Sequence, residues 1–345
     1  MSDRLAALYQ LTLWRTREFL REPEAVFWVF AFPILLAFAL GLAFKNRGPE
    51  RVKIGIVAGP EAGQVRAAFD SVPEIQTLVL DSADGFNRLR TGAVSVLAIP
   101  GDPIALRFDS TRQESHVARL IAENALQHAA GRRDAREIRE IRVTEPGSRY
   151  IDFLIPGLLG MNIMGTGMWG IGFAVVNARQ KKLLKRFLAS PMRKSDYMIA
   201  HMLARLVFLT LEVVSVLVFA WFVFKVPVNG SFAALAVVVL VGAAAFAGLG
   251  LLVASRPKTI EGVSGLMNLV MVPMWICSGV FFSAARFPDA MQPVIKLLPL
   301  TALNDALRAV MIDGVSLSST GGMLAIVAAW GVLSFMVAFR IFRWT

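Results

Sequence analysis

The sequence predicts an α-helical integral membrane protein with six transmembrane helices, an extracytoplasmic α/β domain and an outer re-entrant helical hairpin. Three observations support this prediction. The 345 residues are 56% hydrophobic with a mean hydropathy of +0.58, and the apolar residues fall into discrete blocks. Basic residues gather on alternate connections between these blocks. One long insertion, residues 45–150, alternates short β-branched runs with polar helical stretches.

The six expected spans follow from apolar runs of about 20 residues, the length that crosses the hydrocarbon core. The first, residues 25–44, contains no charge, and residues 151–345 supply the other five. These five runs cover residues 153–176, 197–224, 231–255, 262–285 and 320–339. Residues 1–24 are expected to form a cytoplasmic interfacial helix, because apolar side chains there alternate with arginines and no cleavage site follows.

Lysine and arginine decide the orientation, because short cytoplasmic connections carry an excess of both. The N-terminal segment, the connection after the second span and the connection after the fourth span are basic. We therefore expect a multi-pass protein of the bacterial plasma (inner) membrane with both termini in the cytoplasm. The net charge of +11 lies mostly beside apolar runs, which favours membrane orientation and contact with lipids over nucleic-acid binding.

The long insertion is then extracytoplasmic, since segments of this length cross the membrane largely regardless of charge. Its β-branched runs at residues 52–57, 77–80 and 94–99 predict strands. Residues 61–69 and 82–90 predict helices, and residues 112–142 predict one long polar helix with interleaved charges.

The connection after the second span predicts a short amphipathic cytoplasmic helix over residues 179–190, stopped by Pro191. One interpretation is a basic helix lying on anionic lipid headgroups. The other is a docking element for a cytoplasmic partner. Its candidate docking residues are Arg179, Lys181, Lys182, Leu183, Leu184, Lys185, Arg186, Phe187, Leu188, Ser190 and Pro191.

Residues 286–314 predict the re-entrant segment. Pro288, Pro293 and Pro299 divide an apolar stretch into pieces too short to cross. The alternative is an amphipathic loop. Asp305 and Arg308 lie three residues apart, so we expect them to pair locally.

The third span contains two charged residues on one helical face, Arg205 and Glu212. Charges inside a membrane are costly and point to function. Arg205 lies near the cytoplasmic end, where its side chain can reach the interface. Two interpretations remain for Glu212, a contact between helices and a part of the transport path.

These segments together resemble the permease subunits of type-2 ATP-binding-cassette exporters, and the likeness covers nearly the whole chain. It is closest to the subgroup with a large domain between spans one and two. The family's basic motif is matched at Arg179, the leucines, Ser190 and Pro191, whereas Gln180 and Lys182 replace an acidic residue and a glycine. The family's outer motifs are matched at Ser278, Gly279, Phe281, Pro299, Leu300, Thr301, Ala306, Leu307 and Arg308.

The resemblance implies a homodimer or heterodimer of permeases, each docked on a nucleotide-binding ATPase subunit that binds ATP and Mg. The cargo would be a hydrophobic or amphiphilic molecule, drug-like or lipid-like, moved outward. Residues 179–190 and the N-terminal helix would transmit ATP-driven closure. The chain itself has no phosphate-binding loop of the G-x-x-x-x-G-K-[ST] type, so we expect no cofactor bound by this chain.

Three other classes of protein compete with this interpretation. A membrane enzyme is disfavoured because the three histidines form no H-E-x-x-H motif and G-x-S-x-G is missing. The lone Cys277 allows no intramolecular disulfide. A non-transporting scaffold or sensor coupled to an ATPase remains open. A secondary transporter would show repeated halves and several intramembrane ionisable groups.

Overall fold

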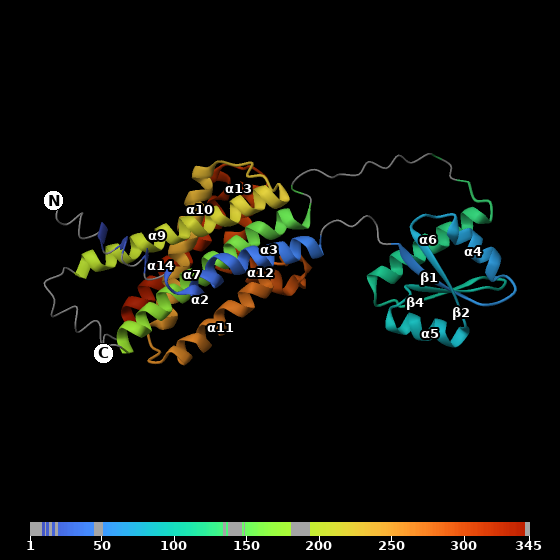
Figure 1. The fold of residues 1–345 in the computed structure, drawn as a ribbon, viewed down its shortest axis with the longest axis horizontal. Helices are drawn as coiled ribbons and strands as arrows, with labels where there is room; N and C mark the ends of the chain where they lie inside the picture. Colours follow the sequence, from blue (N-terminus) through green and yellow to red (C-terminus); the bar gives the residue numbers. More distant parts are fainter. Residues whose placement is uncertain are drawn as a thin grey trace. The chain divides into compact units, whose positions relative to one another are not determined.

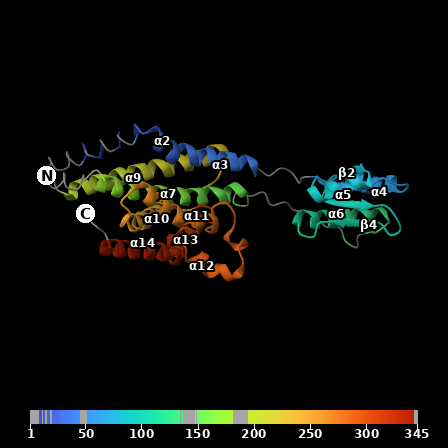
Figure 2. The same cartoon turned by 90° about the horizontal axis from the view of Figure 1, so that it is seen from below.

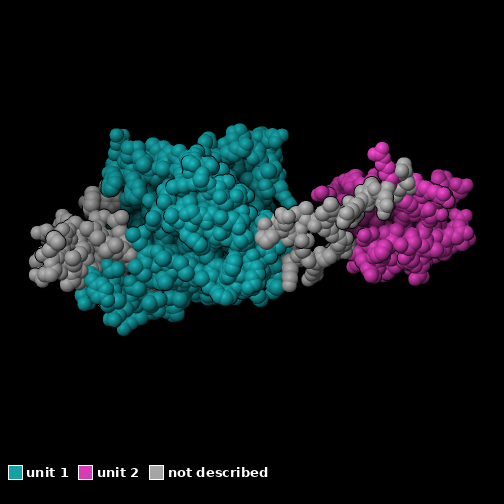
Figure 3. Space-filling model, turned by 90° about the horizontal axis from the view of Figure 1, so that it is seen from above, with its two compact units in different colours: residues 1–45, 143–345 teal, residues 46–142 magenta. Residues whose placement is uncertain are grey.

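The structure, a computed structural model, describes residues 9–10, 12–13, 16–17, 20–44, 51–133, 136, 147, 149–180 and 194–341. The chain divides into two compact units (Figure 3). A helical unit comprises residues 1–45 and 143–345, and an α/β unit comprises residues 46–142.

The helical unit contains several long α-helices and a number of shorter helical elements (Figure 1). Its elements are α2 (Pro23–Val26), η1 (Phe27–Ala31), α3 (Phe32–Ala43), α7 (Tyr150–Gln180), α9 (Lys194–Phe219), η2 (Ala220–Phe224), α10 (Phe232–Ala254), α11 (Ile260–Cys277), η3 (Ala284–Arg286), η4 (Asp289–Met291), α12 (Gln292–Leu297), α13 (Pro299–Met311), η5 (Leu317–Thr320) and α14 (Gly321–Ile341). The elements η1 and η2 are single π-helical turns.

Five helices among the described residues are long and apolar enough to cross a membrane. They are Tyr150–Asn177, Arg205–Phe224, Phe232–Ala254, Ile260–Cys277 and Leu317–Ile341. The first expected span, residues 25–44, contains the shorter apolar helix Phe27–Ala43. A sixth crossing therefore stays a prediction, as does the depth of the short helices α12 and α13 within residues 286–314.

Helix α7 lies at the centre of the helical unit and packs against α3, α9, α10, α11 and α13 (Figure 2). Small residues let these backbones approach closely, as is typical between membrane helices. A methyl group at Gly157 would lie 2.5 Å from the carbonyl oxygen of Val280, and one at Gly250 would lie 2.8 Å from Met168. More than half of the most apolar stretch of α7 is buried. This burial explains why α7 is apolar on every side.

The α/β unit is a four-stranded sheet covered by helices on both faces. The strands β1 (Val52–Val57), β2 (Ile75–Leu80), β3 (Val96–Ile99) and β4 (Ala105–Phe108) have the order β2-β1-β3-β4. Only β4 is antiparallel to its neighbour. Helices α4 (Ala62–Asp70) and α6 (Gln113–Ala129) pack on one face and α5 (Ser82–Thr91) on the other (Figure 1).

The strands and short helices expected in the insertion are confirmed, whereas the long helix at residues 112–142 is wrong. Helix α6 ends at Ala129, and Gly131 has a left-handed backbone with φ of 95°. The amide of Gly131 donates to His128 O, and the amide of Arg132 donates to Gln127 O. A glycine in this conformation satisfies the last carbonyls and stops the helix.

Candidate functional site

The predicted docking segment lies almost entirely outside the described residues. Of its eleven candidates the structure describes Arg179. The others are Lys181, Lys182, Leu183, Leu184, Lys185, Arg186, Phe187, Leu188, Ser190 and Pro191, and their docking role stays a prediction.

Arg179 binds the end of a neighbouring helix. Its guanidinium donates to Pro257 O at 2.6 Å, to Ser255 O at 3.2 Å and to Ala254 O at 3.3 Å. The next side chain, Gln180, donates to Lys258 O at 3.2 Å. Helix C-terminal carbonyls lack partners within their own helix and form the negative end of its dipole. The last turn of α7 therefore caps α10 and holds the connection to α11. We call Arg179, Gln180 and residues 254–258 the Arg179 end of the helical unit.

Arg205 and Glu212 on α9 meet at one hydroxyl group, that of Thr166 on α7. Arg205 Nη2 donates to Thr166 Oγ1 at 2.6 Å. The same hydroxyl lies 3.5 Å from Glu212 Oε1 and 2.7 Å from Asn162 O. Both charged side chains thus face one helix, as their spacing predicts. We call Arg205, Thr166 and Glu212 the Thr166 bridge.

Glu212 is fully buried, and its Oε2 has no hydrogen-bond partner among the described residues. One turn along α7, Asn162 donates to Val29 O in the π-turn η1 at 3.2 Å. Polar contacts therefore link three helices that are otherwise apolar in this region. Of the two interpretations of Glu212, the contact between helices is the one with a visible partner.

A second polar cluster lies at the opposite end of α7, where no docking or transport residue was predicted. Asp152 is fully buried. Arg149 donates to its two oxygens from Nη2 at 2.7 Å and Nε at 2.9 Å, and Arg149 Nη1 donates to Phe224 O at 2.8 Å. The carboxylate of Asp152 raises the pKa of Arg149. Arg149 therefore caps η2 as Arg179 caps α10.

The same end ties α7 to three further elements. The ring of Tyr150 lies 4.4 Å from that of Phe44, and its hydroxyl donates to Phe281 O at 2.8 Å. Asn304 on α13 donates to Ser278 O at 2.9 Å. Arg308 donates to Gly279 O and stacks on the Phe153 ring at 3.8 Å. We call Arg149, Tyr150, Asp152, Asn304 and Arg308 the Arg149 hub.

The expected local pair of Asp305 and Arg308 is confirmed, with Nη1 of Arg308 3.4 Å from Asp305 Oδ1. The guanidinium nevertheless makes its other contacts with carbonyls of other elements. Because these partners are backbone oxygens distant in sequence, residue spacing alone gives no signal for them.

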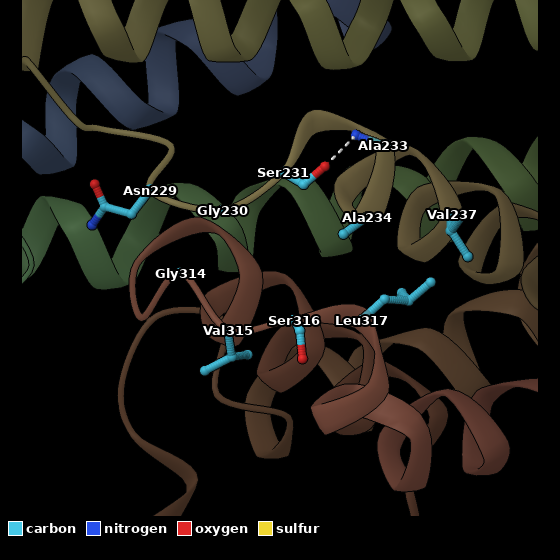
Figure 4. Close-up of a pocket in the computed structure, with 10 residues that line it drawn as sticks. All are labelled: Asn229, Gly230, Ser231, Ala233, Ala234, Val237, Gly314, Val315, Ser316 and Leu317. Atoms are coloured by element: carbon cyan, nitrogen blue, oxygen red, sulfur yellow. Dashed lines mark hydrogen bonds between the residues drawn. The ribbon is translucent and has the colours of Figure 1, made fainter.

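A pocket of about 450 Å³ lies between the start of α10 and the turn before α14 (Figure 4). Its lining is Asn229, Gly230, Ser231, Ala233, Ala234, Val237, Gly314, Val315, Ser316 and Leu317. Ser231 accepts a hydrogen bond from the Ala233 amide and so caps α10. No charged side chain lines this pocket. The ionisable residues considered for a functional role lie instead in the Thr166 bridge and the Arg149 hub. Among the described residues no group of three His, Cys, Asp or Glu side chains is placed to hold a metal ion.

Comparisons with known proteins point to one family. The family described as "ABC-2 family transporter protein" matches residues 24–340. ABC transporter G family member 20 of Dictyostelium discoideum is 28% identical over 194 residues, which are 56% of this chain and 26% of that protein. The inner membrane transport permease YadH of Escherichia coli is 25% identical over 205 residues, which are 58% of this chain and 75% of YadH. The probable multidrug ABC transporter permease YbhR of the same species is 23% identical over 202 residues, covering 57% of this chain and 54% of YbhR.

Proposed function

The chain belongs to the ABC-2 family of transporter proteins, and we propose that it is the membrane subunit of an ATP-driven exporter of hydrophobic or amphiphilic molecules. The observation that carries this proposal is the family match over residues 24–340, which covers the described helices long enough to span a membrane except for the final residue, Ile341. ATP and Mg would be bound by a separate ATPase subunit. A second permease, of the same or a similar sequence, would complete the transporter.

The proposed orientation puts the Arg179 end in the cytoplasm. Arg179, Arg256, Lys258 and Arg340 all lie in or beside helix termini at that end. Excess positive charge marks the cytoplasmic side. The α/β unit and the Arg149 hub would then face outward. A topology reporter fused at Gly131 is expected to read outside and one at Lys182 inside; the opposite pattern would contradict this orientation.

The proposed cargo class rests on α7 and α11, which pack together. On α7 the rings of Trp169 and Phe173 stack at 4.8 Å, and Phe173 is exposed. On α11 the polar residue Asn268 is exposed next to Leu269, within a candidate span. A polar group facing lipid in this position is costly. Contact with a second permease or with an amphiphilic cargo would relieve that cost.

The experiment that tests the function is purification of the tagged protein from its native membrane in mild detergent, followed by mass spectrometry and an ATPase assay. A stoichiometric partner with a phosphate-binding loop would support the proposal. Replacement of Lys181 and Lys185 by glutamate should then abolish stimulation of the ATPase while membrane insertion continues. A pure protein without any ATPase would favour a scaffold or an enzyme instead.

A further inference from the structure

Arg179 makes three hydrogen bonds to one neighbouring stretch of the chain. They end on carbonyl oxygens of Ala254, Ser255 and Pro257, which belong to the last residues of α10 and to the connection that follows. A guanidinium offers five N–H donors in a planar fork, so one arginine can hold several carbonyls at once. Both terminal nitrogens of Arg179 therefore donate to the end of a neighbouring helix of the same chain.

The connection between α10 and α11 is short and held at both ends. Helix α10 ends at Ala254 and α11 begins at Ile260. On the α10 side Ser255 donates to Leu252 O. On the α11 side Thr259 accepts a hydrogen bond from the Gly262 amide at 3.1 Å and so caps the helix. These hydrogen bonds fix both ends of the connection to the adjoining helices.

The end of α7 is also joined directly to the predicted docking segment. Gln180 is the last residue of α7, and the predicted docking segment continues from residue 181. Gln180 itself donates to Lys258 O in the same connection. Two consecutive side chains at the root of the docking segment therefore hold residues 254–258, directly before α11.

We propose that Arg179 is a positioning residue that couples the docking segment to α11, so that the end of α7 and the connection at residues 255–259 move as one body during the ATP cycle. The proposal rests on the function proposed above. Movement imposed by the ATPase subunit on residues 181–190 reaches α11, the helix with the exposed Asn268, through this contact. Arg179 acts through its hydrogen-bonding fork, and the docking charge comes from the lysines that follow it.

The first test distinguishes the charge of Arg179 from the planar geometry of its guanidinium donors. Arg179→Lys keeps the charge but loses the planar set of donors, so one ammonium group cannot bridge the same carbonyls. ATP-driven transport in reconstituted vesicles should fall about tenfold while the ATPase subunit still co-purifies. The matched control is Arg256→Lys, at an exposed arginine of the same connection, which should transport normally. Full transport by Arg179→Lys would overturn the proposal.

The second test replaces the lost contact by a covalent one. Cys277 is the only cysteine, so Cys277→Ala provides a background for Gln180→Cys and Lys258→Cys. Joining these two positions with a disulfide or a short bis-maleimide should restore transport to Arg179→Lys, because the two segments are proposed to move together. A crosslink that blocks transport in the chain with Arg179 would show that the segments separate, and the proposal would be wrong.

The crosslinking yield distinguishes failure of this proposal from failure of the proposed function, since it requires no transport. Arg179→Lys should lower the yield several-fold, in membranes with or without ATP. An unchanged crosslinking yield would overturn the proposed role of Arg179 but would not affect the proposed exporter function. A lowered yield in a protein that shows no ATP-driven transport even with Arg179 in place would refute the exporter function, and the coupling with it.

Discussion

Two carboxyl groups in the helical unit are equally buried but differ in their hydrogen bonding. Asp152 and Glu212 are both fully shielded from solvent. Asp152 accepts from the Gly147 amide at 2.8 Å, from the Arg149 amide at 3.2 Å and twice from the Arg149 guanidinium. Among the described residues, the carboxyl group of Glu212 lies within hydrogen-bond distance of Thr166 Oγ1 alone, at 3.5 Å, and its second oxygen has no hydrogen-bond partner.

This difference indicates which contacts hold the fold and which can rearrange. A buried charge with every lone pair satisfied fixes the groups around it, whereas an incompletely satisfied one leaves an alternative arrangement close in energy. The Arg149 hub joins several elements at the end of α7 opposite to Arg179. The Thr166 bridge joins α9 to α7 through one hydroxyl group. We therefore expect substitutions at the hub to cost stability and substitutions at the bridge to cost little.

The largest effect is expected at the centre of the hub. Asp152→Asn removes the charge that pairs with Arg149 and leaves the guanidinium facing an amide. Breaking a buried pair on one side typically costs about 3 kcal/mol or more. The thermal unfolding midpoint of the purified protein in detergent should fall clearly. Asp289→Asn, at an exposed position near the same end, is the control and should leave it unchanged. If Asp152→Asn and Asp289→Asn unfold at the same temperature, the hub does not stabilise the fold, and the proposed difference between hub and bridge is wrong.

A steric substitution tests the hub from a second side. A methyl group at Gly160 would overlap Asn304 Oδ1, so Gly160→Ala forces away the amide that holds Ser278 O. Overpacking of this kind costs about 1–3 kcal/mol. Gly170→Ala is the matched control on the same helix, because nothing lies within 4 Å of the added methyl group. If Gly160→Ala and Gly170→Ala have the same thermal unfolding midpoint, the contact made by Asn304 does not stabilise the hub.

Sequence periodicity predicted most of the fold because apolar runs and alternating β-branched residues are local signals. It placed β1 at residues 52–57 correctly and missed β4 (Ala105–Phe108). The latter is a short antiparallel edge strand that includes Arg107. The sequence predicts a helix longer than α6 because the interleaved charges continue past the end of α6. Only Gly131 marks that end.

The candidate site was less predictable for a different reason. The face shared by Arg205 and Glu212 follows from helical spacing, but their common partner Thr166 lies on another helix. The hub and the Arg179 end join side chains to backbone oxygens far away in the sequence, as Arg149 does with Phe224. Any residue type can present a carbonyl oxygen, so no pattern of side chains reveals such contacts.

A smaller effect is expected at the bridge. Glu212→Gln replaces the buried carboxyl group by an amide of the same shape beside the hydroxyl of Thr166. Because the carboxylate has little to lose in hydrogen bonds, stability should change by less than about 1 kcal/mol, or rise slightly. The unfolding midpoint in detergent measures this change. A loss as large as that of Asp152→Asn would mean that Glu212 has strong partners, and the comparison between the two carboxylates would fail.

The smallest effect concerns a partly exposed carboxylate, which allows the effect of hydrogen bonds to be measured without full burial. In the α/β unit Asp109 accepts from the Thr111 hydroxyl at 2.7 Å and from its amide at 2.9 Å, and these bonds lower the pKa of Asp109. A lowered pKa in the folded state adds stability above the unfolded pKa, and this stability is lost as pH falls through the folded value. Thr111→Ala should raise the pKa of Asp109 toward its usual value and move acid unfolding of this unit to slightly higher pH. NMR titration of carboxyl-labelled aspartate measures the shift, with Thr91→Ala, another exposed threonine of the same unit, as the control. An unchanged pKa would mean that hydrogen bonds of this geometry are too weak to explain the hub, and that the stability expected around Asp152 comes from its ion pair with Arg149 alone.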